Sequence, residues 1–126
     1  MERLVIICLS GAAGTGMRYL IGMWAAQRFG SSFPYGTMIV NLAGCFAMGA
    51  VMHAALTLAW SETTRAAVTI GFLGGLTTYS AFNYETTRLL ETGAYASALM
   101  NVAATLFGAV VAGVLGMWLM RLALAR

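Results

Sequence analysis

Charged side chains are scarce in this chain of 126 residues. They make up 9% of it, against about 25% in a typical soluble domain, while 60% of the residues are hydrophobic and the mean hydropathy is +0.82. There is no Lys, and the seven Arg residues that set the net charge of +3 are spread along the chain without forming a basic stripe. The composition therefore indicates a chain that resides in lipid and argues against a nucleic-acid-binding surface.

Cysteine and proline are rare as well. Cys8 and Cys45 each lie in an apolar run, and no Cys and His residues have the spacing of a zinc site. Two buried thiols acting as small hydrophobic side chains explain them more simply than a disulfide, although the sequence leaves a disulfide open. No nucleophile with a neighbouring base stands out, so we do not expect an enzyme.

Four apolar segments are each long enough to cross a membrane as a helix, which takes about 20 residues. We expect a single all-α transmembrane domain over residues 1–126. Its predicted helices cover residues 3–27, 34–60, 65–91 and 95–121. The first segment resembles a signal peptide, but Glu2 precedes it and its apolar pattern runs on through Trp24, so we predict a retained helix.

The charges bias the orientation of these helices only weakly. With four spans, both termini and the loop between the second and third helices share one side of the membrane. That side holds Arg3, Arg65, Arg121 and Arg126, and the other holds Arg28 and Arg88. Four Arg against two favour cytoplasmic termini by so small a margin that insertion in both orientations, with antiparallel dimerisation, stays open to the chain. Four short helices also need a partner to enclose a conduction path.

The third predicted helix contains an interruption in residues 71–85, GFLGGLTTYSAFNYE. Gly74 and Gly75 each cost about 1 kcal/mol relative to Ala in a helix interior. The hydroxyl groups that follow, on Thr77, Thr78 and Ser80, can bond the local backbone in place of a helical turn. Non-helical backbone at membrane depth is tolerated only when it is buried or lines a cavity, and such breaks direct carbonyls and helix ends at ions. We therefore predict an ion-handling protein.

Polar residues lie inside the other spans. Arg18 either pairs with an acid, faces a wet cavity or extends to the interface. Asn41 either joins two helices or lines a pore, and the polar line of the third helix favours the pore. His53 has no carboxylate neighbour in sequence and is interpreted as a structural hydrogen-bonding residue.

Two aromatic residues of the interrupted segment share a helical face, because Tyr79 and Phe82 are three residues apart and Glu85 follows one turn later. Aromatic residues at this spacing usually serve ordinary packing. Only the adjoining break and the pattern of the whole chain favour a functional interpretation.

Taken together, these features resemble the Fluc (CrcB) family of fluoride ion channels over essentially the whole chain. The resemblance rests on the length, the four spans, the segment PYGTMIVN that ends at Asn41, and the segment GGLTTYSAF that starts at Gly74. It implies an antiparallel, dual-topology homodimer in the bacterial inner membrane. Two pores along the subunit interface would let fluoride leave the cytoplasm passively.

The resemblance also assigns roles to single residues. The fluoride pore would be lined by Asn41, Tyr79, Ser80, Phe82 and Thr105. Backbone carbonyls of Gly74 and Thr77 from both subunits would hold a structural sodium ion, and Arg18 and Glu85 would lie near the pathway. Two positions depart from the family pattern: Tyr79 stands where Phe is usual, and Ala81 replaces a residue with a hydroxyl.

The physical chemistry of fluoride agrees with these residue types. Fluoride is small and strongly hydrated, so a pore has to replace its water with fixed hydrogen-bond donors, and selectivity follows from the pore width and these donors. Asn41, Ser80, Thr105 and the Tyr79 hydroxyl are such donors. The positive edges of aromatic rings can also meet a desolvated anion.

Two other functions fit less well. A small dual-topology drug/proton antiporter needs a titratable carboxylate at its binding site, and Glu85 is the one candidate because the other Glu residues lie near the ends of the spans. The first helix holds no acid in its interior, which counts against this function. A membrane assembly subunit without transport would explain the glycines but not the polar line of the third helix.

Overall fold

The computed structural model describes residues 1–125, and the described chain is helical without strands. The all-α class is therefore confirmed. The elements in chain order are α1 (Glu2–Phe29), α2 (Tyr35–Thr57), α3 (Glu62–Ala66), the π-helical η1 (Ala67–Leu73), α4 (Gly74–Leu76), α5 (Tyr79–Glu91) and α6 (Tyr95–Leu124).

Three of these helices, α1, α2 and α6, are long and apolar enough to cross a membrane, with 28, 23 and 30 residues. The chain is thus a multi-pass membrane protein. The third predicted span, residues 65–91, is divided between α3, η1, α4 and α5. The second span ends at Thr57, earlier than the predicted residue 60, because Ala59 adopts a left-handed conformation with φ of 50°.

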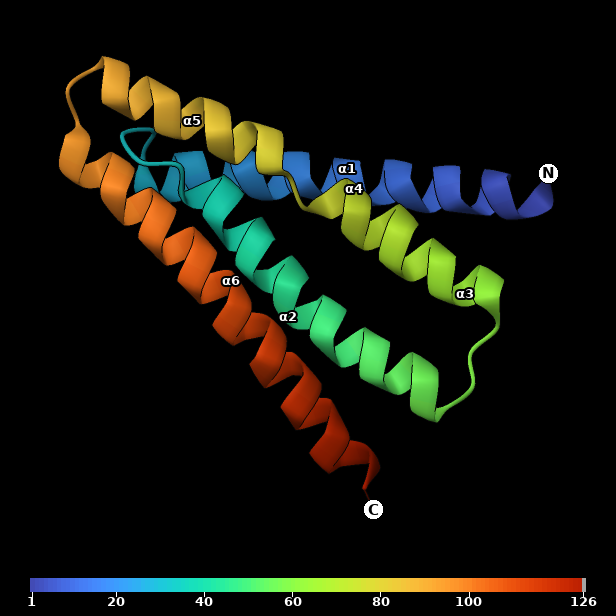
Figure 1. Cartoon of the computed structure of the whole chain (residues 1–126). Coiled ribbons are helices and arrows are strands. Elements are labelled where there is room, and N and C mark those ends of the chain that lie inside the picture. The colour runs from blue at the N-terminus through green and yellow to red at the C-terminus, as the bar shows by residue number, and fades with distance from the viewer. Residues whose placement is uncertain (126) are drawn as a thin grey trace.

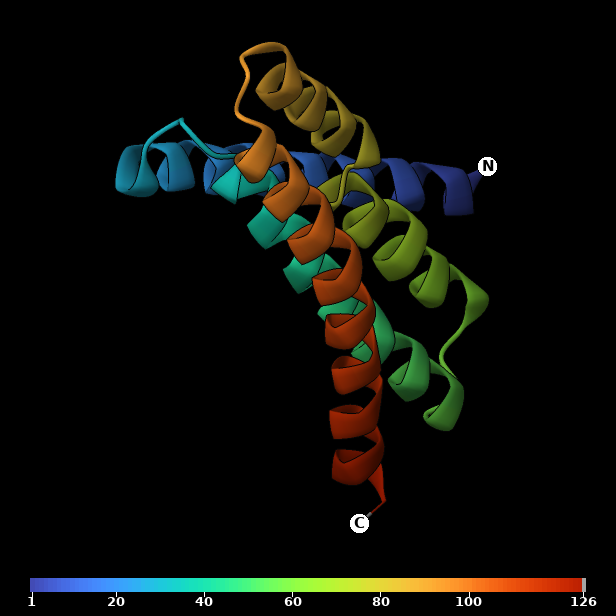
Figure 2. The ribbon, with the colours of Figure 1, turned by 60° about the vertical axis from the view of Figure 1, so that its left-hand side comes forward.

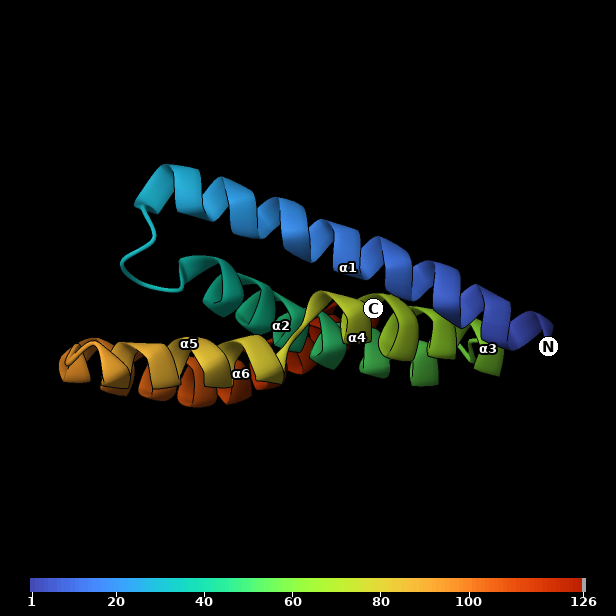
Figure 3. The same ribbon diagram turned by 90° about the horizontal axis from the view of Figure 1, so that it is seen from above.

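In the views of Figures 1 and 2, α1 crosses the α2–α6 pair near the starts of α2 and α6. Figure 1 shows α2 running alongside α6, while α1 passes behind α2 and diverges from α6. Figure 2, a view turned about the vertical axis, shows the same crossing of α1 over the α2–α6 pair. Seen from above in Figure 3, α1 lies on one side, α5 and α6 lie on the other, and α2 lies between them. Val40, Leu73 and Leu76 form the buried apolar cluster near the centre.

Glycine allows backbone to touch backbone at two helix contacts. A Cβ added to Gly49 of α2 would overlap the carbonyl oxygen of Gly113, and one added to Gly116 of α6 would overlap that of Phe46. The contact of α1 with η1 and α4 has the same character, because a Cβ on Gly14 would overlap the Phe72 carbonyl oxygen. Small residues that allow such close approach are the usual means of packing helices in lipid.

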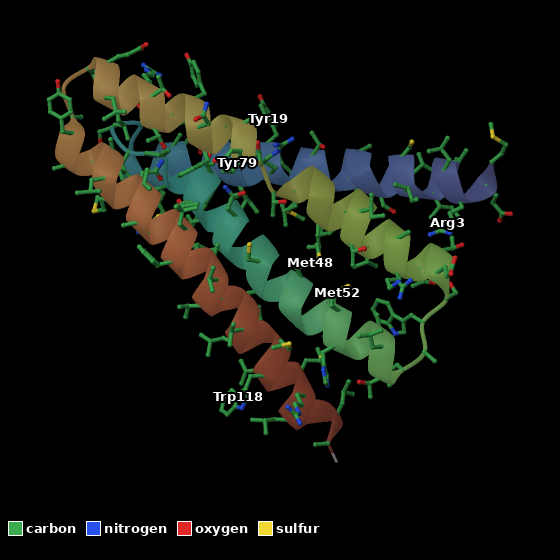
Figure 4. All side chains as sticks on the ribbon, viewed as in Figure 1. Arg3, Tyr19, Met48, Met52, Tyr79 and Trp118 are labelled. Carbon is green, nitrogen blue, oxygen red and sulfur yellow. The ribbon has the colours of Figure 1, made fainter. Side chains whose placement is uncertain are left out.

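The outer faces of α1 and α6 are apolar and exposed. Trp118 of α6 is 54% exposed and points away from α2, whereas Met48 of α2 packs against the central cluster (Figure 4). At one end of the molecule, aromatic rings gather around the α1–α2 connection, where Phe29 and Tyr35 have ring centroids 5.3 Å apart. Aromatic residues at the end of a bundle are typical of the membrane–water interface.

The opposite end of the molecule holds the N-terminus, the start of α3 and the end of α6 (Figure 1). Arg3 Nη1 donates to Glu62 Oε2 over 3.0 Å, which ties the first turn of α1 to the start of α3. Both side chains are at least half exposed, so water screens this ion pair and its contribution to stability is small.

Candidate functional site

The helical course is interrupted between α4 and α5. Thr77 has φ −86° and ψ 155°, and Thr78 has φ −153° and ψ 119°, so both residues are extended. Threonine side chains replace the missing turn: Thr77 Oγ1 donates to the Leu73 carbonyl over 2.9 Å, and Thr78 Oγ1 accepts the Ala81 N–H over 3.2 Å. Thr78 is therefore the N-cap of α5. Figure 1 shows the short link and the sideways offset between α4 and α5.

Asn41 of α2 holds the interruption from the side. Its Nδ2 donates to the Thr78 carbonyl over 3.0 Å, and its Oδ1 accepts the Thr78 N–H over 2.8 Å. The side chain is 8% exposed. Both polar atoms of the carboxamide thus bind one backbone residue, and a single N–H of Nδ2 is left for another acceptor.

These side-chain bonds change which backbone carbonyls are satisfied. In an uninterrupted α-helix the Thr78 N–H would bond the Gly74 carbonyl, and the Ala81 N–H would bond the Thr77 carbonyl. Here Asn41 takes the first N–H and the Thr78 hydroxyl takes the second. The carbonyls of Gly74 and Thr77 have therefore lost their regular helical donors. They are the two carbonyls that the family resemblance assigns to sodium.

The helix after the interruption is attached at two further points. Thr37 Oγ1 of α2 donates to Glu85 Oε1 over 2.8 Å. Asn101 Nδ2 of α6 donates to Thr86 Oγ1 over 2.9 Å, and Thr86 Oγ1 donates in turn to the Phe82 carbonyl over 2.7 Å. Side-chain hydrogen bonds from two neighbouring helices therefore fix α5.

Two buried oxygens in the described chain have no hydrogen-bond partner: Glu85 Oε2 and Thr105 Oγ1. Thr105, on α6, is 7% exposed. A buried hydroxyl without a partner costs about 1–3 kcal/mol, so such a group calls for a ligand or a water molecule.

The two aromatic residues of the site differ in exposure. Tyr79, the first residue of α5, is 76% exposed (Figure 4), whereas Phe82 is 6% exposed. Their ring centroids are 5.6 Å apart and the rings are tilted by 47°. Ser80 is exposed, and its hydroxyl lies 3.2 Å from that of Thr78. Tyr79 and Ser80 therefore face outward from the protomer, while Phe82 packs within it.

Two adjoining cavities separate the second half of α1 from α5. One, of about 560 Å³, is lined by Arg18 together with Thr15, Thr37, Thr78 and Ala81. Arg18 is half-buried, and no carboxylate in the described residues lies within ion-pair distance of it. The other cavity, of about 430 Å³, is lined by Glu85, Arg88 and the loop that contains Ser31 and Ser32. Arg18 thus faces a cavity and has no acidic partner there.

His53 lies one turn before the end of α2, where its backbone carbonyl accepts the Thr57 hydroxyl over 2.9 Å. The described residues contain no group of three His, Cys, Asp or Glu side chains that could hold a metal ion.

Sequence reasoning did not identify Thr37, Thr86 or Asn101 as parts of the site. Asn101 carried a usable signal, because it is a carboxamide in an apolar helix and stands four residues before Thr105, on the same face. Thr86 carried none, since a Thr near the end of a span is unremarkable until its partner on another helix is known.

Comparison with known proteins gives a consistent result. The family described as CrcB-like protein, Camphor Resistance (CrcB), matches residues 5–117. A protein of Sorangium cellulosum named fluoride-specific ion channel FluC is 51% identical over 118 residues, which are 93% of each chain. Proteins of the same name from Citrifermentans bemidjiense and Chloroflexus aurantiacus are 52% and 41% identical, over 81% and 96% of this chain and 83% and 97% of theirs. The chain therefore belongs to the CrcB-like family, as its motifs predicted.

Proposed function

We propose that this protein is a fluoride-selective channel that lets fluoride leave the cytoplasm passively across the bacterial inner membrane. The observation that carries the proposal is the interruption at Thr77 and Thr78, where hydrogen-bond donors and freed carbonyls gather within an apolar protein. The names of the relatives supply the identity of the ion. They also disfavour the antiporter, and Glu85, its one candidate carboxylate, already accepts a hydrogen bond from Thr37.

The donors for fluoride are the groups whose hydrogen-bonding capacity is unused within the protomer. Asn41 retains one N–H, and the Thr105 hydroxyl is buried without a partner. Ser80 and the Tyr79 hydroxyl are exposed on the outer side of α5. Phe82 would offer its ring edge to the passing ion. A desolvated fluoride accepts hydrogen bonds from such donors, which replace its lost water.

Arg18 and Glu85 take different parts in this pathway. The unpaired guanidinium of Arg18 makes its cavity attractive to anions, so we place the entrance there. Glu85 would repel fluoride from its own position, and its bond to Thr37 keeps the carboxylate at one place beside the second cavity. We infer that Arg18 draws fluoride into the first cavity and that Glu85 keeps it out of the second.

A structural sodium ion fits the interruption. The carbonyls of Gly74 and Thr77 have lost their helical donors to the Asn41 and Thr78 side chains. Carbonyl oxygens are hard ligands that suit a hard cation. Gly74 is exposed at the surface of the protomer, so one protomer supplies only part of a coordination shell. The ion would contribute a fixed positive charge near the fluoride path.

An antiparallel homodimer would complete both sites. Gly74, Tyr79 and Ser80 are exposed, although they belong to a segment that should lie at membrane depth. Lipid does not hydrogen-bond to backbone or hydroxyl groups, so these residues need protein or an aqueous pore beside them. An inverted second copy brings two interruptions face to face and supplies four carbonyls to one cation. It also creates two equivalent pores, one on each side of the cation.

Efflux from liposomes tests the proposed function. Purified protein is reconstituted into vesicles loaded with potassium fluoride or potassium chloride, and an anion-sensitive electrode follows the release after valinomycin is added. We expect rapid fluoride release and chloride release that stays at the level of protein-free vesicles. Equal release of the two halides, or fluoride release only with a proton gradient, would contradict the proposal.

A further inference from the structure

Asn101 is the most deeply buried polar side chain in the described part of the protein, with 1% of its surface exposed. It lies on α6, whose exposed side chains are mostly apolar. Its Nδ2 donates to Thr86 Oγ1 on α5 over 2.9 Å. Neither residue belongs to the proposed pore or to the cation site.

Thr86 passes this connection on to the backbone of α5 through a second hydrogen bond. Thr86 Oγ1 donates its own hydrogen to the Phe82 carbonyl over 2.7 Å. The Asn101 carboxamide, the Thr86 hydroxyl and the Phe82 backbone thus form one chain of hydrogen bonds. Such a chain fixes the hydroxyl in one orientation, since its oxygen accepts from one neighbour while its hydrogen is donated to the other.

The position of this chain determines what it can control. Phe82 is three residues after Tyr79 on α5, and Thr86 is one turn further along the same face. No glycine brings the backbone of α5 against a neighbouring helix, as happens for η1 and α4. The rotation of α5 about its own axis is therefore set by its side-chain bonds and by the packing of Phe82. Asn41 holds Thr78, the N-cap residue before α5, and Asn101 holds α5 on the far side of Phe82.

We propose that Asn101 is a positioning residue of the pore, which acts through Thr86 to set the rotation of α5 and hence the direction of the Phe82 ring. The inference rests on the proposed function, since it needs Phe82 to face the fluoride path. Asn101 itself touches no ion. Loss of the bond would let α5 rotate, so the edge of the Phe82 ring would turn away from the fluoride path.

The chain offers a matched pair of substitutions to test this. Thr86→Val removes the hydroxyl that links Asn101 to Phe82. Thr87→Val removes a hydroxyl that makes the same kind of intrahelical bond, to the Asn83 carbonyl over 3.0 Å, but Thr87 is exposed and bonds no other helix. Thr86→Ser retains the hydroxyl, and Asn101→Ala removes the other end of the bond.

We expect Thr86→Val and Asn101→Ala each to lower fluoride efflux roughly tenfold and to narrow the preference for fluoride over chloride, as loss of one buried hydrogen bond allows. The double variant should be no worse than either single variant, because both break one chain. Thr87→Val and Thr86→Ser should keep the wild-type rate and selectivity. All variants should elute as dimers in detergent.

Two results would overturn the proposal. Equal losses for Thr86→Val and Thr87→Val would mean that the interhelical bond has no special role. A lower rate with unchanged halide selectivity and with fewer dimers would reduce Asn101 to a structural contact. Phe82→Ile separates this inference from the proposed function. If it lowers efflux while Thr86→Val does not, the positioning role alone is wrong; if Phe82→Ile has no effect, the pore assignment of Phe82 is wrong.

Discussion

The chain is held in different ways on the two sides of its interruption. Before it, η1 and α4 pack on α1 through backbone contacts, where a Cβ on Gly75 would overlap the Gly11 carbonyl oxygen and one on Gly14 would overlap that of Phe72. After it, α5 has no such glycine contact with a neighbour and is attached through the side chains of Asn41, Thr37 and Asn101.

Because of this difference, substitutions that add volume should disturb folding, whereas substitutions that remove a polar atom should disturb the site. Backbone contacts fail when a side chain is added, because neighbouring helices cannot move apart without loss of packing. Hydrogen bonds fail when a donor or acceptor is removed, and they constrain direction more than distance. The first segment should therefore be sensitive to added volume at its glycine contacts. The second should tolerate small changes in volume but not the loss of a polar atom.

The largest effect is expected at the junction of the two segments. Asn41→Asp replaces the Nδ2 donor with a carboxylate oxygen, so it removes the bond to the Thr78 carbonyl and puts a negative charge on the anion path. We expect fluoride efflux to fall to the level of protein-free vesicles. Asn83→Asp makes the same change at an exposed position of α5 and should retain efflux. Undiminished flux in Asn41→Asp would remove Asn41 from the pathway.

The next largest effect concerns folding. Gly75→Ala adds a Cβ that overlaps the Gly11 carbonyl oxygen, so α1 and α4 must separate. Overpacking of this kind costs about 1–3 kcal/mol, and more when the obstacle is backbone. We expect a low yield of dimer by size-exclusion chromatography and a lower thermal midpoint. Gly16→Ala is the control, because no atom lies within 4 Å of its Cβ position. A normal dimer yield from Gly75→Ala would show that the contact is not tight.

A third prediction addresses the ring of Phe82 on α5. Phe82→Ile keeps an apolar side chain at a buried position but removes the ring edge that we assign to the anion path. Fluoride efflux should fall by about tenfold or more, with dimer assembly intact, because each 1.4 kcal/mol of lost stabilisation lowers a rate tenfold. Phe72→Ile, in η1 and packed on the central cluster, should leave the rate unchanged. Equal rates for wild type and Phe82→Ile would assign Phe82 to packing alone.

The smallest effects should come from a pair of polar contacts. Thr37→Val removes the bond that holds the Glu85 carboxylate in place and should lower fluoride efflux severalfold, because Glu85 lies beside the proposed path without lining it. Arg3→Gln breaks the exposed ion pair with Glu62 in the segment before the interruption, which contributes about 1 kcal/mol or less. Its efflux rate should match wild type. The comparison between the two segments would fail if Arg3→Gln affected efflux more than Thr37→Val.

Much of the fold was accessible from the sequence, because hydropathy and length alone define spans in lipid. Among the residues predicted to interrupt the third helix, Gly74 and Gly75 are helical, and the extended backbone lies at Thr77 and Thr78. The sequence did not predict the π-helical turns of η1 (Ala67–Leu73), because no residue pattern in this segment distinguishes a π-helix from an α-helix.

The polar contacts of α5 could not be predicted for a related reason. Asn41 was identified as a donor, but sequence gives no indication that both its polar atoms bind Thr78. Such a bond requires two helices to meet at one level, which depends on tertiary packing. The same holds for Asn101 and Thr86, which are 15 residues apart and lie on helices joined by a short turn.

The central claim is that an ion path selective for fluoride passes the interruption that Asn41 holds in place. Single-channel recording in a planar bilayer, with fluoride as the sole permeant anion, tests it most directly. We predict discrete fluoride currents that vanish when chloride replaces fluoride and that are lost in Asn41→Asp but retained in Asn83→Asp. Currents of equal size in chloride, or fluoride currents that persist unchanged in Asn41→Asp, would contradict the claim.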